Sequence, residues 1–289
     1  MKKILIPKDF SIQSENASKY AVALCSTFRA ELVIANAFLV PEEAETASRV
    51  AWPLVGYETL KQQSTTDLEL FVQKLGNFVK RKNLNLVSNI DFESRSGSVL
   101  DVTYELVQEK MIDLVVMGMV GAGFLPQIVF GSNCRTMIER ATFPVLYIPG
   151  NTKFKVIEQI AFATDLDLSD IKNIKNMLDL LGCPHVQIRL IHISKKEYRP
   201  GSKEDISVEE FLKEFKLNIE NVDVVYDAVS YIDIEDGLQS LISDLEIDVL
   251  AMVHRHHSFI NRLFHGSHTQ KISRLAQVPL LVLPPLGVK

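Results

Sequence analysis

The chain has 289 residues, of which 47% are hydrophobic and 23% are charged, and its formal net charge is −5. This length is about twice that of a common domain, and the apolar fraction excludes a largely disordered chain, so we expect two folded cores. The acidic balance argues against general binding to nucleic acid.

The cysteines and the first residues indicate the compartment. Cys25, Cys134 and Cys183 are odd in number and far apart, a pattern that suggests neither a disulfide framework nor a Cys-based zinc site. Only three apolar residues separate Lys3 from Pro7, a run too short for the apolar region of a signal peptide. We therefore expect a cytoplasmic protein.

The first half of the chain alternates short apolar runs with helical patterns. Residues 3–9 predict a buried strand that ends in an aspartate. Residues 14–29 carry apolar side chains at helical spacing, with Ser11 or Ser14 available as the N-cap. The later elements that we expect are strands over 32–39, 86–92, 115–117 and 145–149, and helices over 58–82, 99–110 and 132–140.

The segment 114–134 has 21 residues without a charged side chain, which is the length of a membrane-spanning helix. Four glycines and a proline within it would break such a helix repeatedly. We therefore expect a buried strand followed by a loop, and no membrane contact.

The second half of the chain repeats the first. Asp113 matches Asp248 at a separation of 135 positions, as do one glycine and two prolines that follow. Asp9 matches Asp165 at a separation of 156, so the second copy is shorter by 21 residues (156 − 135 = 21). The repeat predicts two domains of the same fold.

Strands alternate with helices in each copy, which predicts right-handed crossovers and a parallel sheet. The expected fold class is α/β, with two tandem doubly wound parallel-sheet domains of five strands each, over residues 1–150 and 151–289. In such sheets ligands bind beyond the carboxyl ends of the strands, at the switch point of the topology.

The loop after the fourth strand is the most informative stretch. Gly118 leaves the strand, and Gly118 and Gly121 have no Cβ, so the backbone could turn tightly and approach a phosphate. Gly131 and Ser132 open the next helix, whose free amides, dipole and hydroxyl would form an anion site. The order matches neither a Walker A loop nor a dinucleotide fingerprint, and turn geometry alone also accounts for glycines in such a loop.

The spacing Gly-x2-Gly-x9-Gly-Ser after the strand 113–118 resembles the universal stress protein family of the ATP-binding type. The run 4–9 (ILIPKD) is similar to the first strand of that family, and the run 144–149 (PVLYIP) to its last. The resemblance covers essentially the whole chain as a tandem form and implies an adenine nucleotide alpha hydrolase-like fold.

The resemblance also implies which residues would bind an adenine nucleotide. The adenosine would be lined by Pro7, Lys8 and Asp9, and the adenine would meet Ala37. Ribose and phosphates would be bordered by Met117, Gly118 and Gly121. Phosphate contacts would come from Gly131, Ser132, Asn133 and Cys134. For Asp9, capping of the first helix is the alternative role.

The loop 122–130 departs from the family, whose members often carry basic residues there, because it is wholly uncharged. Lys8 and Arg135 are the nearest cations in the sequence. A bound triphosphate such as that of ATP would depend on them, on Mg²⁺ and on helix amides; the implied ligand is ATP, or ADP or AMP.

The second copy replaces the two loop glycines by Val253 and His256, so we expect their side chains to crowd the phosphate path and nucleotide binding to be weak or absent there. Basic residues gather in this stretch with no acidic residue among them: His254, Arg255, His256, His257, Arg262, His265, His268, Lys271 and Arg274.

Three interpretations of this His/Arg-rich stretch remain open. One is a zinc or other transition-metal site, with His254, His256, His265 and His268 as candidate ligands. The others are an anion pocket built from side chains and a solvated polar loop.

Catalytic motifs are absent: there is no Gly-x-Ser-x-Gly elbow and no His-Glu-x-x-His. We therefore expect binding rather than turnover, with slow ATP hydrolysis left open. Cys134, near a helix start, could have a lowered pKa and act as a redox sensor, or it could be a packed helix residue.

The leading hypothesis is an ATP-binding stress or regulatory protein whose first domain holds the nucleotide and whose state an unidentified protein partner reads. A scaffold without ligand and a slow ATPase are the alternatives. The resemblance also implies pairing through the last strand, which a tandem chain could satisfy internally between 145–148 and 280–283, so both a monomer with an internal pseudo-dimer and a homodimer remain open.

Overall fold

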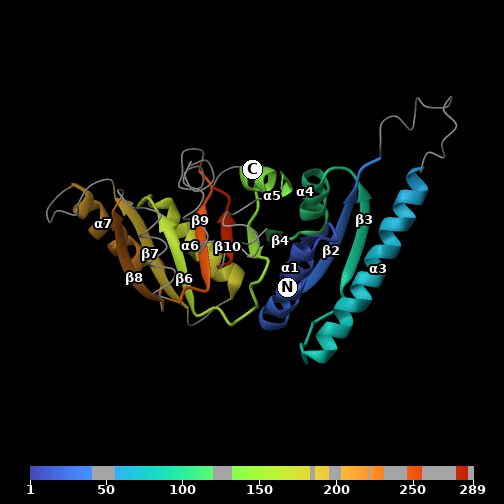
Figure 1. Cartoon of the computed structure of the whole chain (residues 1–289). Helices are drawn as coiled ribbons and strands as arrows, with labels where there is room; N and C mark the ends of the chain where they lie inside the picture. Colours follow the sequence, from blue (N-terminus) through green and yellow to red (C-terminus); the bar gives the residue numbers. More distant parts are fainter. Residues whose placement is uncertain are drawn as a thin grey trace.

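The protein forms one long twisted sheet with helices on both faces (Figure 1). In this computed structural model the described residues are 1–40, 56–119, 132–182, 186–194, 203–220, 222–230, 246–255 and 278–285. Within them, no helix is long and apolar enough to cross a membrane.

The two halves follow the same alternation of strands and helices. In the first half the elements are β1 (Lys3–Pro7), α1 (Ile12–Phe28), β2 (Glu31–Phe38), α3 (Tyr57–Arg81), β3 (Asp91–Ser96), α4 (Val99–Lys110), β4 (Leu114–Met119), α5 (Ser132–Arg140) and β5 (Val145–Pro149). In the second half they are β6 (Gln159–Thr164), α6 (Ser169–Leu181), β7 (Gln187–Ser194), α7 (Lys203–Asn218), β8 (Asp223–Ser230), β9 (Val249–Val253) and β10 (Leu280–Leu283).

The strand order is β3-β2-β1-β4-β5-β10-β9-β6-β7-β8. Neighbours within each half are parallel, whereas β5 and β10 are antiparallel, with Leu281 opposite Leu146. This confirms the α/β class, the five strands of each copy and the pairing of the two last strands. Each half has a switch point, between β1 and β4 and between β6 and β9.

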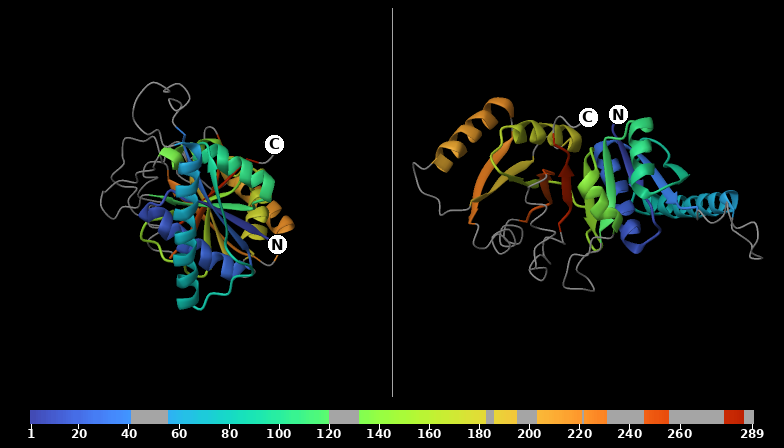
Figure 2. Two further views of the ribbon diagram at one scale, coloured as in Figure 1. Left: turned by 90° about the vertical axis from the view of Figure 1, so that its right-hand side faces the viewer. Right: turned by 90° about the horizontal axis from the view of Figure 1, so that it is seen from above.

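Helices cover the sheet from two sides because side chains of successive strand residues point to opposite faces. The core beneath α1, α3, α6 and α7 runs through both halves, and α4 and α5 pack on the opposite face of the first half (Figure 2). The halves also meet outside the sheet, where the rings of Tyr20 and Phe154 stack edge to face at 5.1 Å.

The third strand differs from its prediction. The sequence pattern favours 86–92, but β3 runs from Asp91 to Ser96 and pairs with β2 from Val33 to Phe38. Residues 91–96 look unlike a strand because they are charged. β3 is an edge strand, where charged side chains are tolerated, and Arg95 forms ion pairs with its neighbour Glu93 and with two glutamates of α4.

Candidate functional site

A cavity of about 290 Å³ opens beyond the carboxyl ends of β1, β2 and β4 in the first half. The residues implied by the resemblance surround it wherever the structure describes them: Pro7, Lys8, Asp9, Ala37, Met117, Gly118, Ser132, Asn133 and Cys134. Gly121 and Gly131 lie outside the described residues. One concave site therefore collects side chains from four separate stretches of the chain.

Seven further residues line the cavity that the sequence did not single out. They come from the first turns of α1 and α4 and from the end of β2: Ser11, Gln13, Ser14, Val99, Val102, Thr103 and Ala35. The signal was available in the order of elements, because a helix that follows a parallel strand begins at the carboxyl end of the sheet.

Gly118 is needed for a packing reason that the sequence pattern does not predict. It lies inside β4, which continues to Met119, rather than at the exit of the strand. A Cβ at this position would lie 2.4 Å from the backbone carbon and oxygen of Gln13. The missing side chain therefore lets the start of α1 pack directly on β4, which brings the first turn of α1 to the cavity.

Asp9 supports the helix cap without being the cap. Ser11 is the N-cap of α1, its hydroxyl accepting from the amide of Ser14 at 3.1 Å. The carboxylate of Asp9 accepts from the amide and hydroxyl of Ser11, at 3.0 and 2.7 Å. Burial opposes the charge, but hydrogen bonds from Ser11 and Ser14 outweigh it and hold the pKa of Asp9 below its ordinary value.

Asp9 is also exposed on the cavity. The carboxylate is therefore ionised at neutral pH and well suited to accept hydrogen bonds from a ligand, such as those of a sugar hydroxyl. A carboxylate with a low pKa is a weak general base.

Lys8 is a buried cation at the wall of the cavity, only 4% exposed. Its Nζ donates to the hydroxyl of Ser14 at 2.7 Å and lies 4.3 Å from the ring centroid of Phe71 on α3. Burial lowers its pKa to about 8, although Asp9 and Glu15 favour the charged form. The second cation considered for phosphates, Arg135, is exposed on α5 and is not one of the described residues that line the cavity.

The burial of Lys8 predicts a pH dependence of stability. Between the folded pKa of about 8 and the ordinary value of 10.5, the unfolded chain binds the extra proton, so the free energy of unfolding rises with pH by up to about 1.4 kcal/mol per unit. Lys8→Met should remove this rise. Urea unfolding across this range measures it, with the exposed Lys80→Met as control. An unchanged slope in Lys8→Met contradicts the assignment.

Cys134 is a packed residue. It is buried on α5, and its Sγ donates to the carbonyl oxygen of Gly118 at 3.3 Å. Burial, with Asp9 adding repulsion, raises the pKa of the thiol to about 12. Of the two interpretations of Cys134, burial and the raised pKa favour the packed helix residue over the reactive thiol.

In the second half, the side chain of Val253 was predicted to crowd a ligand path, but it faces the protein core instead. It ends β9 and is buried in the core beneath the helices. A helix start as close to β9 as α1 is to β4 would not leave room for this side chain. The domains therefore differ in how their first helices approach the sheet.

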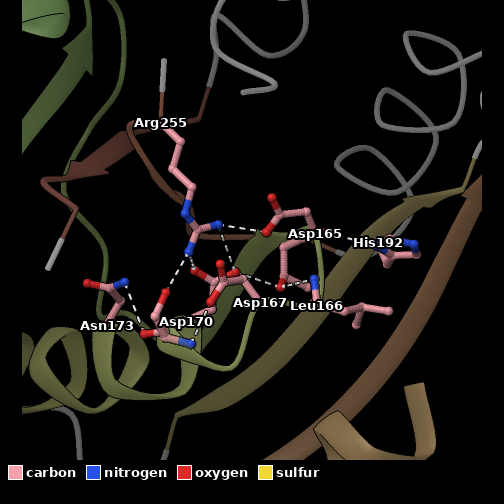
Figure 3. A network of polar contacts seen from close by, with 9 residues as sticks. Asp165, Leu166, Asp167, Asp170, Asn173, His192 and Arg255 are labelled. Atoms are coloured by element: carbon pink, nitrogen blue, oxygen red, sulfur yellow. Dashed lines mark hydrogen bonds and ion pairs between the residues drawn. The ribbon is translucent and has the colours of Figure 1, made fainter. Parts of the chain in front are cut away.

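The His/Arg-rich stretch lies largely outside the described residues, including the candidate ligands His256, His265 and His268. His254 is described and lies just after β9. Over the described ranges no group of three metal-binding side chains occurs. Arg255 is described too, and its guanidinium donates to the carboxylates of Asp165 and Asp170 (Figure 3).

Comparison with known proteins gives the family. A family model described as "Universal stress protein family" matches residues 1–149 and 157–284. A universal stress protein of Methanocaldococcus jannaschii is 29% identical over 147 residues, which are 51% of this chain and 81% of that protein.

A solved structure of similar length shares the fold of the whole chain. The crystal structure of a universal stress protein from Archaeoglobus fulgidus covers 98% of both chains with a TM-score of 0.62 at 13% identity. A universal stress protein solved in complex with cAMP covers 51% of this chain and 96% of its own, at 22% identity and a TM-score of 0.37. Because the family model matches both halves, the chain belongs to the universal stress protein family, in its tandem two-domain form.

Proposed function

We propose that the first domain binds an adenine nucleotide, ATP or its products ADP and AMP, and that the protein acts as a regulator in the stress response. The observation that carries the proposal is the cavity at the switch point of the first domain, which is lined by the residues that the family pattern implies. A partner protein, not yet identified, would read whether the cavity is occupied.

The chemistry of the cavity wall suits a nucleoside with phosphates. Ala35, Ala37, Val99 and Val102 offer apolar surface for the faces of a purine. Asp9 offers acceptors for ribose hydroxyls. At the other side, the first turn of α5 begins at Ser132, where free amides and the helix dipole favour an anion. Mg²⁺ would accompany a di- or triphosphate and screen its charge.

Binding without turnover is the form of the proposal that the site supports best. The low pKa of Asp9 suits a hydrogen-bond acceptor and not a base that activates water. Slow ATP hydrolysis and a scaffold without ligand are the competing outcomes of the test below.

The test combines two measurements on the full chain. Nucleotide released on denaturation of the purified protein is chromatographed, and Mg-ATP, Mg-ADP, AMP and cAMP are titrated calorimetrically. We expect one site per chain. Asp9→Ala should weaken binding by about tenfold to a hundredfold, because a hydrogen bond to a charged group contributes about 1.5–3 kcal/mol.

The matched control is Asp67→Ala, the same change on an exposed position of α3, which should bind as the wild type does. A chain that releases no nucleotide and binds none of the four overturns the proposal in favour of a scaffold. Sustained phosphate release that Asp9→Ala abolishes indicates an ATPase instead.

A further inference from the structure

The guanidinium of Arg255 is held by three side chains of the second domain (Figure 3). Nη1 donates to Oδ1 of Asp165 at 2.6 Å, and Nη2 donates to the hydroxyl of Ser169 at 3.0 Å. Both terminal nitrogens also approach Asp170, Nη2 through a hydrogen bond to Oδ1 and Nη1 at 3.4 Å from Oδ2. The planar group thus bridges the end of β9, the turn after β6 and the first turn of α6.

Each residue that Arg255 contacts has a counterpart in the cavity of the first domain. At the separation of 156 that relates the beginnings of the two copies, Asp165 corresponds to Asp9, Ser169 to Gln13 and Asp170 to Ser14. All three counterparts line the cavity of the first domain. In the second domain the guanidinium therefore lies against the residues that correspond to the cavity wall formed in the first domain by the end of β1 and the start of α1.

The buried charge at this position differs in sign between the two domains. In the first domain a buried cation, Lys8, donates to Ser14. In the second domain the corresponding pair is Thr164 and Asp170. The hydroxyl of Thr164 donates to the buried carboxylate of Asp170 at 2.8 Å. Asp170 has a side chain that is only 1% exposed, so its charge needs a partner inside the protein. Arg255 is that partner.

We propose that Asp165, Ser169 and Asp170 form a guanidinium-binding site that Arg255 of the same chain fills, and that this internal ligand closes the second domain to the nucleotide for which the first domain is open. The planar fork of an arginine matches two carboxylates in a way that a lysine ammonium does not. Because Arg255 belongs to the same chain, the site is filled whether or not a nucleotide is present.

The experiment is chemical rescue. Arg255→Gly leaves the carboxylate of Asp170 buried and unpaired, and we expect the melting temperature to fall by on the order of 5 to 10 °C. Methylguanidinium chloride at low millimolar concentration should restore most of this loss by refilling the site. Methylammonium chloride should not, and neither salt should raise the melting temperature of the wild type.

A second variant tests the role of the carboxylate. Asp170→Ser introduces the residue of the first domain at this position. Combined with Arg255→Gly, it removes the unpaired charge, so the double variant should melt above the single variant and should no longer respond to methylguanidinium. If the single variant yields no folded protein, recovery of the fold in the double variant is the expected result.

The proposal is overturned by any of three results: Arg255→Gly melts as the wild type does, methylammonium rescues it as well as methylguanidinium does, or the double variant is no more stable than the single one.

Discussion

Gly118→Val should cost the first domain at least about 3 kcal/mol of its free energy of unfolding and should abolish ligand binding at its cavity. The added Cβ would stand 2.4 Å from the carbonyl carbon and oxygen of Gln13, which are backbone atoms that no rotamer change can move aside. Relief requires α1 to shift away from β4. Ser11 and Ser14, which line the cavity from the first turn of α1, would move with it.

Denaturant unfolding followed by nucleotide titration measures both effects. Gly76→Ala is the matched control, since Gly76 lies inside α3 with nothing within 4 Å of the added Cβ. It should stabilise the chain by about 0.5–1 kcal/mol. A Gly118→Val protein that unfolds and binds as the wild type does would show that the start of α1 yields without cost.

Leu281→Asp should destabilise both domains together, by more than about 4 kcal/mol. Leu281 is fully buried in β10, opposite the equally buried Leu146 of β5, at the antiparallel junction of the two half-sheets. An aspartate there would bury a carboxylate away from water, beside a leucine that cannot compensate its charge. Because one core runs beneath the helices of both halves, the damage should reach the first domain although the change lies in the second.

The measurement is thermal unfolding followed by probes in each domain. The single tryptophan of the chain lies outside the described residues, so amide hydrogen exchange of β1 and β6 serves better. Val156→Asp, on an exposed position between the domains, is the control and should change little. If β1 keeps its protection while β6 loses it, the halves are separate folding units and the expectation of coupling is wrong.

Much of the first domain was predictable because its signals are local. The helices α4 and α5 begin and end at the residues expected from apolar spacing, and β5 spans the expected run. Hydrophobic periodicity reflects which side chains of an element are buried. It can therefore be recognised in the sequence without knowing which elements pack against that face. The repeat likewise follows from spacing alone, whereas the pairing of the last strands, which the structure confirms, was implied by the family resemblance.

The lining of the cavity was predictable in part from the family pattern, whose residues are required there for different physical reasons. Asp9, Ser132 and Asn133 lie on it as the family pattern implies. Gly118 also lies on the cavity, but the structure adds a requirement that the sequence does not reveal: a side chain there would clash with the backbone of Gln13, far away in sequence. The order of elements places the start of α4 at the carboxyl end of the sheet, but the packing of the helix on the sheet decides that Val99 and Val102 reach the cavity.

The sequence by itself determined the two-fold repeat, the α/β class and the stretches that face the carboxyl end of the first half-sheet, since these depend on local spacing and on the direction of parallel strands. Only the tertiary structure decided the nature of the second domain's site. Arg255 stands in a stretch without acidic residues, yet the crossover topology places β9 beside β6 and so delivers Asp165 and Asp170 to its guanidinium from about 90 residues away in sequence. Charge pairing acts over a few ångströms of space, and distance along the chain does not reveal it.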